Sequence, residues 1–315
     1  MIPSSVEKMM LAALMCCASA FSAAAGGNER LNQGAGAAFY VSADNEDFST
    51  RRLAAEYLPD FNHGDSLTGV RYTNHYFEQN AWSRRGHQLS LMHRNVDMAT
   101  ATGWQLEGGV FQQNGHDLLT LDGSWRTLLA DRTGLELMIS RDWVETANAL
   151  DEGIHHTFAG VAMDQGIGHH VTLIGLVGRQ EFSNDNFRNH ARFRFIVQPD
   201  LDLGLTLQAR FRAFRSGRAD VNGAYFNPEQ FQEAMFVLGW RRRIEGWMIS
   251  SVAGTGRQKV SDAPHRPSHL LEIGLQSPAS RAYSVRLRGG ISQSASFNGP
   301  DYRFRYLQAE LIIGF

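Results

Sequence analysis

Four arginines recur at alternate positions in two neighbouring stretches of this chain: Arg192 and Arg194, then Arg210 and Arg212. Alternate side chains of an extended strand share one face, so each pair points the same way. Fixed guanidinium groups along a wet passage attract anions and donate paired hydrogen bonds to carboxylates or sugar hydroxyls. The alternative interpretation is that such charges pair across strands and only stiffen a wall. Arg286, Arg288 and Glu310 are further candidates for residues that line this wet passage.

Other residue patterns do not support enzymatic or metal chemistry. His155-His156 and His169-His170 are adjacent pairs in predicted strands, where neighbouring side chains point to opposite faces, so neither pair can bind one ion. No spacing sets Ser140 and His156 apart as a hydrolytic pair. No glycine-rich phosphate loop precedes a helix. We expect no catalytic residue, no metal and no cofactor, and we do not expect an enzyme.

The last stretch, from Tyr302 to Phe315, indicates the kind of element that carries the charged side chains. Every second residue there is apolar: Leu307, Ala309, Leu311, Ile313 and Phe315. The residues between them are Tyr306, Gln308, Glu310, Gly314 and one apolar exception, Ile312. Such alternation predicts a strand with hydrocarbon on one side and a wetter interior on the other.

The N-terminus predicts a secretory signal. Lys8 precedes an apolar run from Met9 to Phe21, and Ala23-Ala24-Ala25 follows. We expect residues 1–25 to be a signal peptide cleaved after Ala25, because the run is too short to span a bilayer as a helix. Both cysteines of the chain, Cys16 and Cys17, lie in this segment, so we expect no disulfide in the mature chain.

Composition excludes a helical membrane protein but not a membrane barrel. Charged residues make up 20% of the chain, and no later stretch approaches the eighteen apolar residues of a spanning helix. Membrane barrels give weak hydropathy signals because only alternate residues meet lipid. The net charge of −2 does not indicate a polyanion as partner, and we expect no nucleic acid.

Apolar alternation broken by turn residues predicts an all-β chain: one antiparallel transmembrane barrel of about sixteen strands. After a short segment at 26–34, the barrel is expected to cover 35–315. The expected strands are 35–44, 49–58, 67–77, 82–94, 102–112, 117–129, 134–143, 155–163, 169–180, 188–198, 202–214, 232–243, 246–257, 268–276, 282–292 and 302–315. Two stretches, Met235 to Trp240 and Val171 to Val177, are apolar on both faces, so their register stays undecided.

The connections predict an orientation. If the first strand leaves the periplasm, the periplasmic links are short and rich in Gly, Pro, Asp and Ser. The opposite links include the long ones, Glu145 to Ile154, Ser216 to Phe231 and Val260 to Pro267, of which the first has room for a helical turn. This asymmetry is typical of outer-membrane barrels. Five tryptophans near strand ends would suit the bilayer interface: Trp82, Trp104, Trp143, Trp240 and Trp247.

The closing strand resembles that of bacterial outer-membrane barrels, whose last aromatic residue is read by the barrel-assembly machinery. The resemblance implies this role for Leu311, Ile313 and Phe315. A second segment, Tyr225-Phe226-Asn227-Pro228, resembles one in the sixteen-stranded barrels of bacterial exopolysaccharide export proteins, the kind that secrete cellulose, poly-N-acetylglucosamine or Pel. Those proteins usually carry a helical repeat scaffold before the barrel, and no helical repeats are found here before the first strand.

We therefore expect a barrel in the bacterial outer membrane that takes part in exopolysaccharide export. Its expected partners are outer-membrane lipid, the assembly machinery, a polysaccharide, and a periplasmic scaffold or synthase complex that replaces the missing repeats. Two alternatives stay open. One is a porin for small solutes that prefers anions, and the other is a plugged barrel with a structural or adhesive role.

Overall fold

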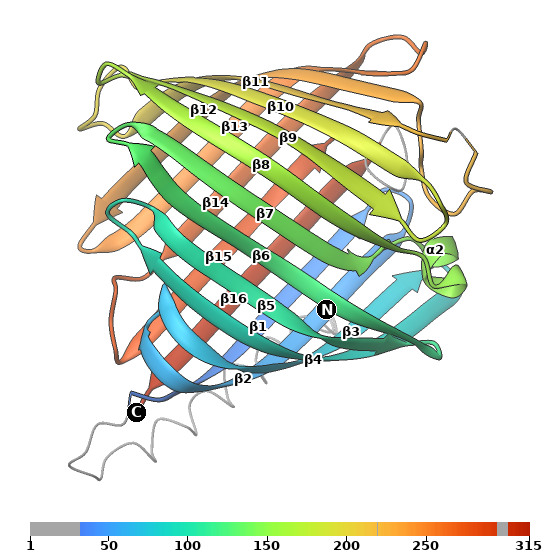
Figure 1. Cartoon of the computed structure of the whole chain (residues 1–315), viewed down its shortest axis with the longest axis horizontal. Helices are drawn as coiled ribbons and strands as arrows, with labels where there is room; N and C mark the ends of the chain where they lie inside the picture. The colour runs from blue at the N-terminus through green and yellow to red at the C-terminus, as the bar shows by residue number, and fades with distance from the viewer. Residues whose placement is uncertain (1–31, 219, 295–301) are drawn as a thin grey trace, which may run out of the picture.

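The computed structural model describes residues 32–218, 220–294 and 302–315, which form one closed antiparallel barrel with a short helix (Figure 1). The predicted fold class and strand number are confirmed. The strands are β1 (Gly34–Asp44), β2 (Phe48–His63), β3 (Ser66–Gln79), β4 (Trp82–Asp97), β5 (Thr102–Gln113), β6 (His116–Ala130), β7 (Thr133–Trp143), β8 (His155–Ile167), β9 (Val171–Phe182), β10 (Phe187–Val197), β11 (Leu205–Ser216), β12 (Gln230–Ile244), β13 (Trp247–Val260), β14 (Arg266–Gln276), β15 (Tyr283–Gln293) and β16 (Arg303–Gly314). The predicted signal peptide, 1–25, lies outside the described residues.

The barrel closes between its first and last strands. Each strand pairs with its sequence neighbours, and β1 pairs with β16 from Gly34 opposite Gly314 to Asp44 opposite Phe304. Beyond the strands, the backbone N–H of Phe315 donates to the carbonyl of Gln33 at 2.9 Å. Closure leaves no strand edge without a partner, which a sheet in hydrocarbon requires.

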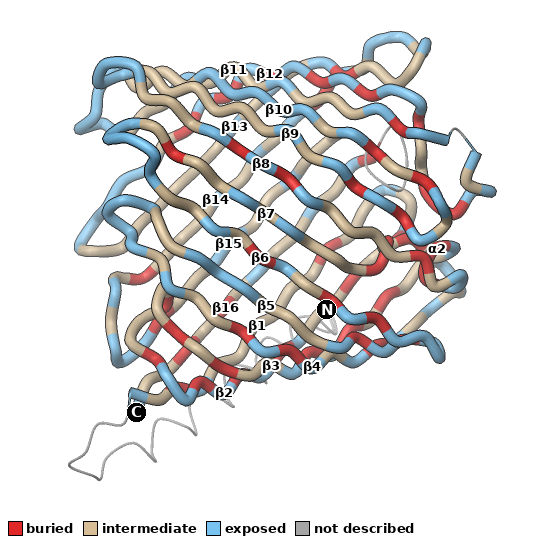
Figure 2. The backbone as a smooth tube through the Cα atoms, viewed as in Figure 1, coloured by how far each residue is buried: buried red, intermediate tan, exposed pale blue. Residues whose placement is uncertain are grey.

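Side chains alternate between the lumen and the outer surface. In Figure 2, short buried and exposed segments follow one another along several of the strands, such as β2 and β12. In β12, Phe236 is 78% exposed on the outside, while Met235 and Val237 are buried inside, which settles the register that the sequence left undecided. Large apolar side chains such as Leu91, Leu119 and those of other strands form an exposed outer belt, the face that a membrane barrel turns to lipid.

The two ends of the barrel differ as predicted. Both described ends of the chain lie at one end, shown by the hydrogen bonds between Gln33 and Phe315. The other end carries the long links 144–154 and 217–229, and α2 (Ala147–Glu152) lies in the first of them. Thr146 caps this helix by accepting from the Ala149 N–H, and Gly153, with φ of 67°, ends it. The link predicted at 260–267 covers only 261–265. None of the described helices is long and apolar enough to cross a membrane.

The lumen is partly filled from both ends. Near the termini, Leu58, Phe61 and Leu67 of the β2–β3 hairpin are buried against Met92 and Ile312. This explains the one apolar exception on the wet face of the last strand, because Ile312 contacts the hairpin rather than water. At the opposite end, Leu150 of α2 packs among rings and side chains of the mouth: Phe48, Phe77, Phe111, Leu118 and Trp143. The prediction that Trp143 lies at the bilayer interface is therefore wrong, since its ring is buried in this cluster.

Candidate functional site in the barrel lumen

The predicted arginine ladder is formed by β10 and β11. Arg192 pairs in register with Arg212, and Arg194 with Arg210. These two strands keep all four side chains on the lumen face, since Phe193 and Phe211 between them are exposed on the outer surface. Among the residues that the structure describes, no carboxylate lies within 4.0 Å of the guanidinium group of Arg192, Arg194 or Arg210. This part of the wall therefore carries uncompensated positive charge.

The other predicted arginines are neutralised by carboxylates. Arg212 lies 3.3 Å from Glu233 and donates to the Ser294 hydroxyl at 2.6 Å. Arg288 lies 2.6 Å from Glu272, which also accepts a hydrogen bond from Tyr306. For these two arginines the geometry fits the alternative of charges that pair across strands.

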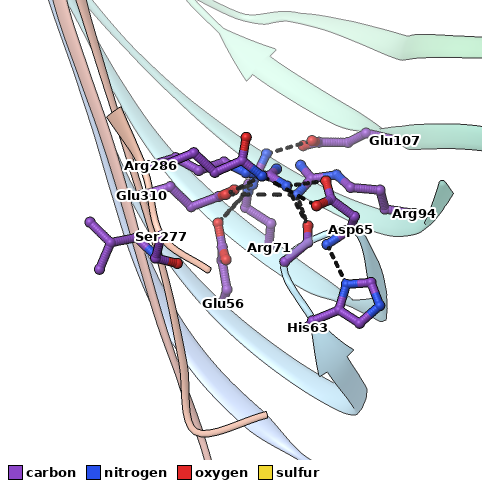
Figure 3. Close-up of polar contacts among 12 residues, drawn as sticks. Glu56, His63, Asp65, Arg71, Arg94, Glu107, Ser277, Arg286 and Glu310 are labelled. Atoms are coloured by element: carbon purple, nitrogen blue, oxygen red, sulfur yellow. Dashed lines mark hydrogen bonds and ion pairs between the residues drawn. The ribbon is translucent and has the colours of Figure 1, made fainter. Parts of the chain in front are cut away.

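Arg286 and Glu310 belong to a larger network in the half of the lumen near the termini (Figure 3). At its centre, Arg71 lies 2.7 Å from Glu56, 2.5 Å from Glu107 and 3.2 Å from Glu310. Glu310 is also 3.5 Å from Arg286. The Glu56 side chain is fully buried, so its charge depends on Arg71 for compensation.

The network also holds the tip of the β2–β3 hairpin inside the lumen. Arg286 forms an ion pair with Asp65 and donates to the Gly64 carbonyl at 2.7 Å. Gln276 of β14 donates to Asp65 at 3.2 Å, and Arg94 of β4 donates to the Gly64 carbonyl at 2.6 Å. In the barrel, β4 is next to β3, whereas β14 lies on the β2 side, beyond β1, β16 and β15. Because the hairpin tip contacts both β4 and β14, it reaches across part of the bore. The link between the strands predicted at 49–58 and 67–77 lies at the end that carries the chain termini, and its inward course was not part of the sequence-based prediction.

Two irregularities turn the hairpin inward. The pairing of β2 with β3 slips between Tyr57 and Asp60 and again between Phe61 and His63. Bulges of this kind bend a strand and increase its twist. The predicted second strand ended at residue 58, and the structure extends it to His63 as part of this bent segment.

The segment Tyr225 to Pro228 belongs to the link 217–229 and is held against the barrel mouth by Arg188 of β10. The Arg188 guanidinium donates to the Phe226 carbonyl at 2.5 Å and to the Asn227 side chain. It lies over the Tyr225 ring at 5.5 Å and over two more rings, Phe182 at 5.2 Å and Phe214 at 4.9 Å. Pro228 is buried. Arg188 and this link are called the mouth latch below.

The mouth latch also contacts α2. Thr146 donates from its hydroxyl to the Ala224 carbonyl at 2.6 Å, and Asn148 donates to the Gly223 carbonyl at 3.0 Å. The Tyr225 hydroxyl donates to Asn184 at 3.2 Å and accepts from Asn186 at 3.0 Å. Burial raises the pKa of this phenol, which keeps it a hydrogen-bond donor at neutral pH. The two long links thus form one folded layer at the mouth.

A polar pocket of about 600 Å³ lies beneath this layer on the β16–β1–β7 side of the lumen. Tyr40 of β1, Tyr302 and Phe304 line this pocket, and together with Tyr306 they form a series of near-parallel rings. The ring centroids are 5.7 Å apart for Tyr302 and Phe304, 5.7 Å for Phe304 and Tyr306, and 6.3 Å for Tyr306 and Tyr40. We call these four residues the aromatic series. Three more side chains in the pocket can form hydrogen bonds: Asp122, Ser140 and Gln308. Within the described part of the chain, none of the three is hydrogen-bonded to another side chain.

Comparisons with known proteins bear on the fold. No family model matches the chain, and no curated protein matches it. Among solved structures, the chain is similar to one titled "Bacterial polysaccharide outer membrane secretin", with a TM-score of 0.63 and 10% identity over 91% of this chain and 100% of that chain. Weaker matches include OpdQ of Pseudomonas aeruginosa (TM-score 0.40, 10% identity, 89% and 98% covered) and the KdgM porin in complex with disordered oligogalacturonate (0.33, 8%, 89% and 99%). The fold is that of a bacterial outer-membrane β-barrel.

An outer-membrane barrel has short turns toward the periplasm and longer loops outside, so the α2 end is the extracellular end. The terminal-strand residues Leu311, Ile313 and Phe315 point away from the lumen, and the Phe315 side chain is 52% exposed. Of the four histidines considered as possible metal ligands, His155 and His156 are half-buried, and His169 and His170 are exposed. In the described ranges, no three His, Cys, Asp or Glu side chains are grouped to hold a metal ion.

The sequence did not single out several side chains that shape the lumen. Arg188 shares the alternate spacing of Arg192 and Arg194, and this spacing was the available signal for it. Asp65 sits in a Gly-Asp turn, which by itself indicates only a connection. The aromatic series could have been noticed from Tyr302, Phe304 and Tyr306 at alternate positions, but the fourth ring, Tyr40, joins it only through closure of the barrel.

Proposed function

We propose that this barrel is a passage for a polysaccharide across the outer membrane. The observation that carries the proposal is the aromatic series beside the polar pocket. Pyranose rings present apolar C–H faces that pack on aromatic rings, and hydroxyl groups at their edges that need hydrogen-bond partners. A concave wall that combines both kinds of group suits such a ligand.

The pocket offers those partners within one lumen segment. Asp122 and Ser140 come from β6 and β7, and Gln308 lies on β16 beside the rings. Asp142, also in the pocket, accepts one backbone N–H, from Trp143 at 2.8 Å. Carboxylate and amide groups can each bond two neighbouring sugar hydroxyls. The similarity to the polysaccharide secretin supports the proposal only at the level of fold.

The described lumen is narrowed at both ends, so we expect the passage to widen during transport of a polymer. The β2–β3 hairpin narrows the periplasmic half, and α2 and the mouth latch pack side chains into the extracellular mouth. A periplasmic scaffold or synthase complex would act on the hairpin, which lies at the end it can reach. The barrel in this state is a restricted form of the passage, and we expect it to conduct small ions.

Single-channel recording of the refolded mature chain in planar bilayers tests the proposal. We expect current steps that neutral oligosaccharides block from one or both sides. Phe304→Ala should weaken the block about tenfold, because one ring of the series is lost. Phe158→Ala removes a lumen ring outside the series and serves as the matched control. Block that is absent in the wild type, or equal in both variants, would contradict the proposal.

A second candidate, an anion-preferring porin, rests on the uncompensated charge of Arg192, Arg194 and Arg210. Fixed positive charge in a narrow bore raises the local concentration of anions. In a salt gradient, the reversal potential should indicate anion preference, and replacing the three arginines by serine should abolish it. Arg179→Ser on the outer surface is the control. If small anions pass and sugars never block, this function replaces the first.

A further inference from the structure

The outer wall of the barrel has an apolar groove across β5 to β10, the strands at the front of Figure 1. Its volume is about 1120 Å³. The groove lies on the lipid side, because its large apolar side chains are among those exposed on the outer surface: Trp104, Trp125, Leu137, Ile139, Val161 and Val177. It is separate from the lumen pocket, which lies on the other side of the same wall.

Small residues hollow this part of the belt. Gly123 and Ala159 occupy outward positions between the larger side chains. A Cβ atom at Gly123 would lie 2.8 Å from the Leu106 side chain, so glycine keeps the groove open there. Adjacent strands are about 4.8 Å apart, so the groove across these six strands is roughly 20–25 Å long. That length and its apolar lining suit one extended acyl chain.

The extracellular end of the groove is cationic. Arg179 and Asn189 line it there, and Arg141 lies above Ile139 on the same face. Arg141 donates to the Leu119 carbonyl at 3.1 Å and to Thr157 at 3.0 Å, and within the described part of the chain no carboxylate lies within 4.0 Å of its guanidinium. Arg179 is 3.0 Å from Glu181, but its side chain is still 51% exposed. The extracellular end of the groove therefore carries two guanidinium groups, of which only Arg179 is paired with a carboxylate.

We infer that this groove is a binding site for a phosphorylated glycolipid with several acyl chains, the class of lipid that fills the outer leaflet of bacterial outer membranes. One acyl chain lies in the groove. The phosphate accepts hydrogen bonds from Arg141 and Arg179, whose planar donors match phosphate oxygens. The position at the extracellular end assigns the phosphate to the outer leaflet, and this excludes the phospholipid of the inner leaflet as the occupant.

Native mass spectrometry of the refolded full barrel, with lipid A or phosphatidylglycerol added, tests the inference. We expect one lipid A molecule to stay bound per barrel after the detergent is removed. Arg141→Ser combined with Arg179→Ser should lower its retention about tenfold by removing the phosphate contacts. Ala159→Phe should lower it similarly by filling the groove while leaving both arginines in place.

Two variants away from the groove are matched controls: Arg257→Ser, an exposed cation at the same end of β13, and Leu271→Phe, an enlarged lipid-facing side chain on β14. Neither should change the retention. Equal loss in the controls and the groove variants would overturn the site, and so would phosphatidylglycerol retained as well as lipid A. Because the readout is lipid retention, it does not depend on what the lumen transports.

Discussion

At the scale of single residues, Arg188 holds the link 217–229 at the extracellular mouth. The alternate spacing of arginines in the sequence does not indicate this role. Three rings surround its guanidinium group, and its hydrogen bonds hold the backbone of Phe226. We expect Arg188→Ala to release the link 217–229, giving larger and noisier current steps and faster cleavage of this link by protease. Arg215→Ala is the control, since its pair with Glu229 is mostly exposed and contributes little. Unchanged conductance and cleavage would show that the latch does not depend on Arg188.

Arg71 gives a second prediction at this scale, on stability. Arg71→Met removes the ion-pair partner of the buried Glu56, so we expect a loss of about 3–5 kcal/mol in the free energy of unfolding. Urea titration of the barrel in lipid vesicles measures it. Adding Glu56→Gln should restore part of the loss. For comparison, Arg51→Met breaks a half-exposed pair with Glu78, which should cost about 0–1 kcal/mol.

At the scale of elements, the inward β2–β3 hairpin is the segment whose removal should widen the bore. A Cβ atom at Gly64 would lie 2.2 Å from the Ser284 hydroxyl, so Gly64→Val should push the hairpin tip away from β15. We expect a higher conductance in planar bilayers. Gly175→Val is the control, because a Cβ atom there meets nothing within 4 Å. If both variants conduct like the wild type, the hairpin does not limit the current.

The strands were largely predictable from the sequence, whereas the course of the β2–β3 hairpin was not. Alternation alone predicted the number and type of strands, because the two faces of each strand meet different surroundings. The alternation also showed Ile312 as the one apolar residue on the lumen face of the last strand, but its packing against the hairpin could not be predicted. The hairpin could not be predicted, since two register slips and contacts with Arg286, more than 200 residues away, decide its path. The arginine ladder was placed on the correct strands, but which members are paired depends on Glu233, Ser294 and Glu272 across the barrel.

At the scale of the whole molecule, the last strand closes the barrel and is also expected to guide its assembly. Phe315→Ser should slow insertion by the barrel-assembly machinery, measured as folded barrel formed over time in proteoliposomes that contain it. The same variant should refold normally in detergent, because the Phe315 side chain is half exposed and its backbone hydrogen bonds to Gln33 are kept. Equal insertion rates for variant and wild type would refute this role for the terminal ring.

Closure of the barrel also fixes the relative positions of positive and negative side chains around the lumen. Arg192, Arg194 and Arg210 lie on β10 and β11, whereas the pocket acids Asp122 and Asp142 lie on β6 and β7. These arginines and these acids therefore lie on different parts of the wall around the bore. Dipolar molecules between them, water included, will orient toward these unlike charges. If the barrel carries a polymer as proposed, that polymer would meet positive charge on one side and acidic side chains on another, and this would favour one rotational setting of the polymer.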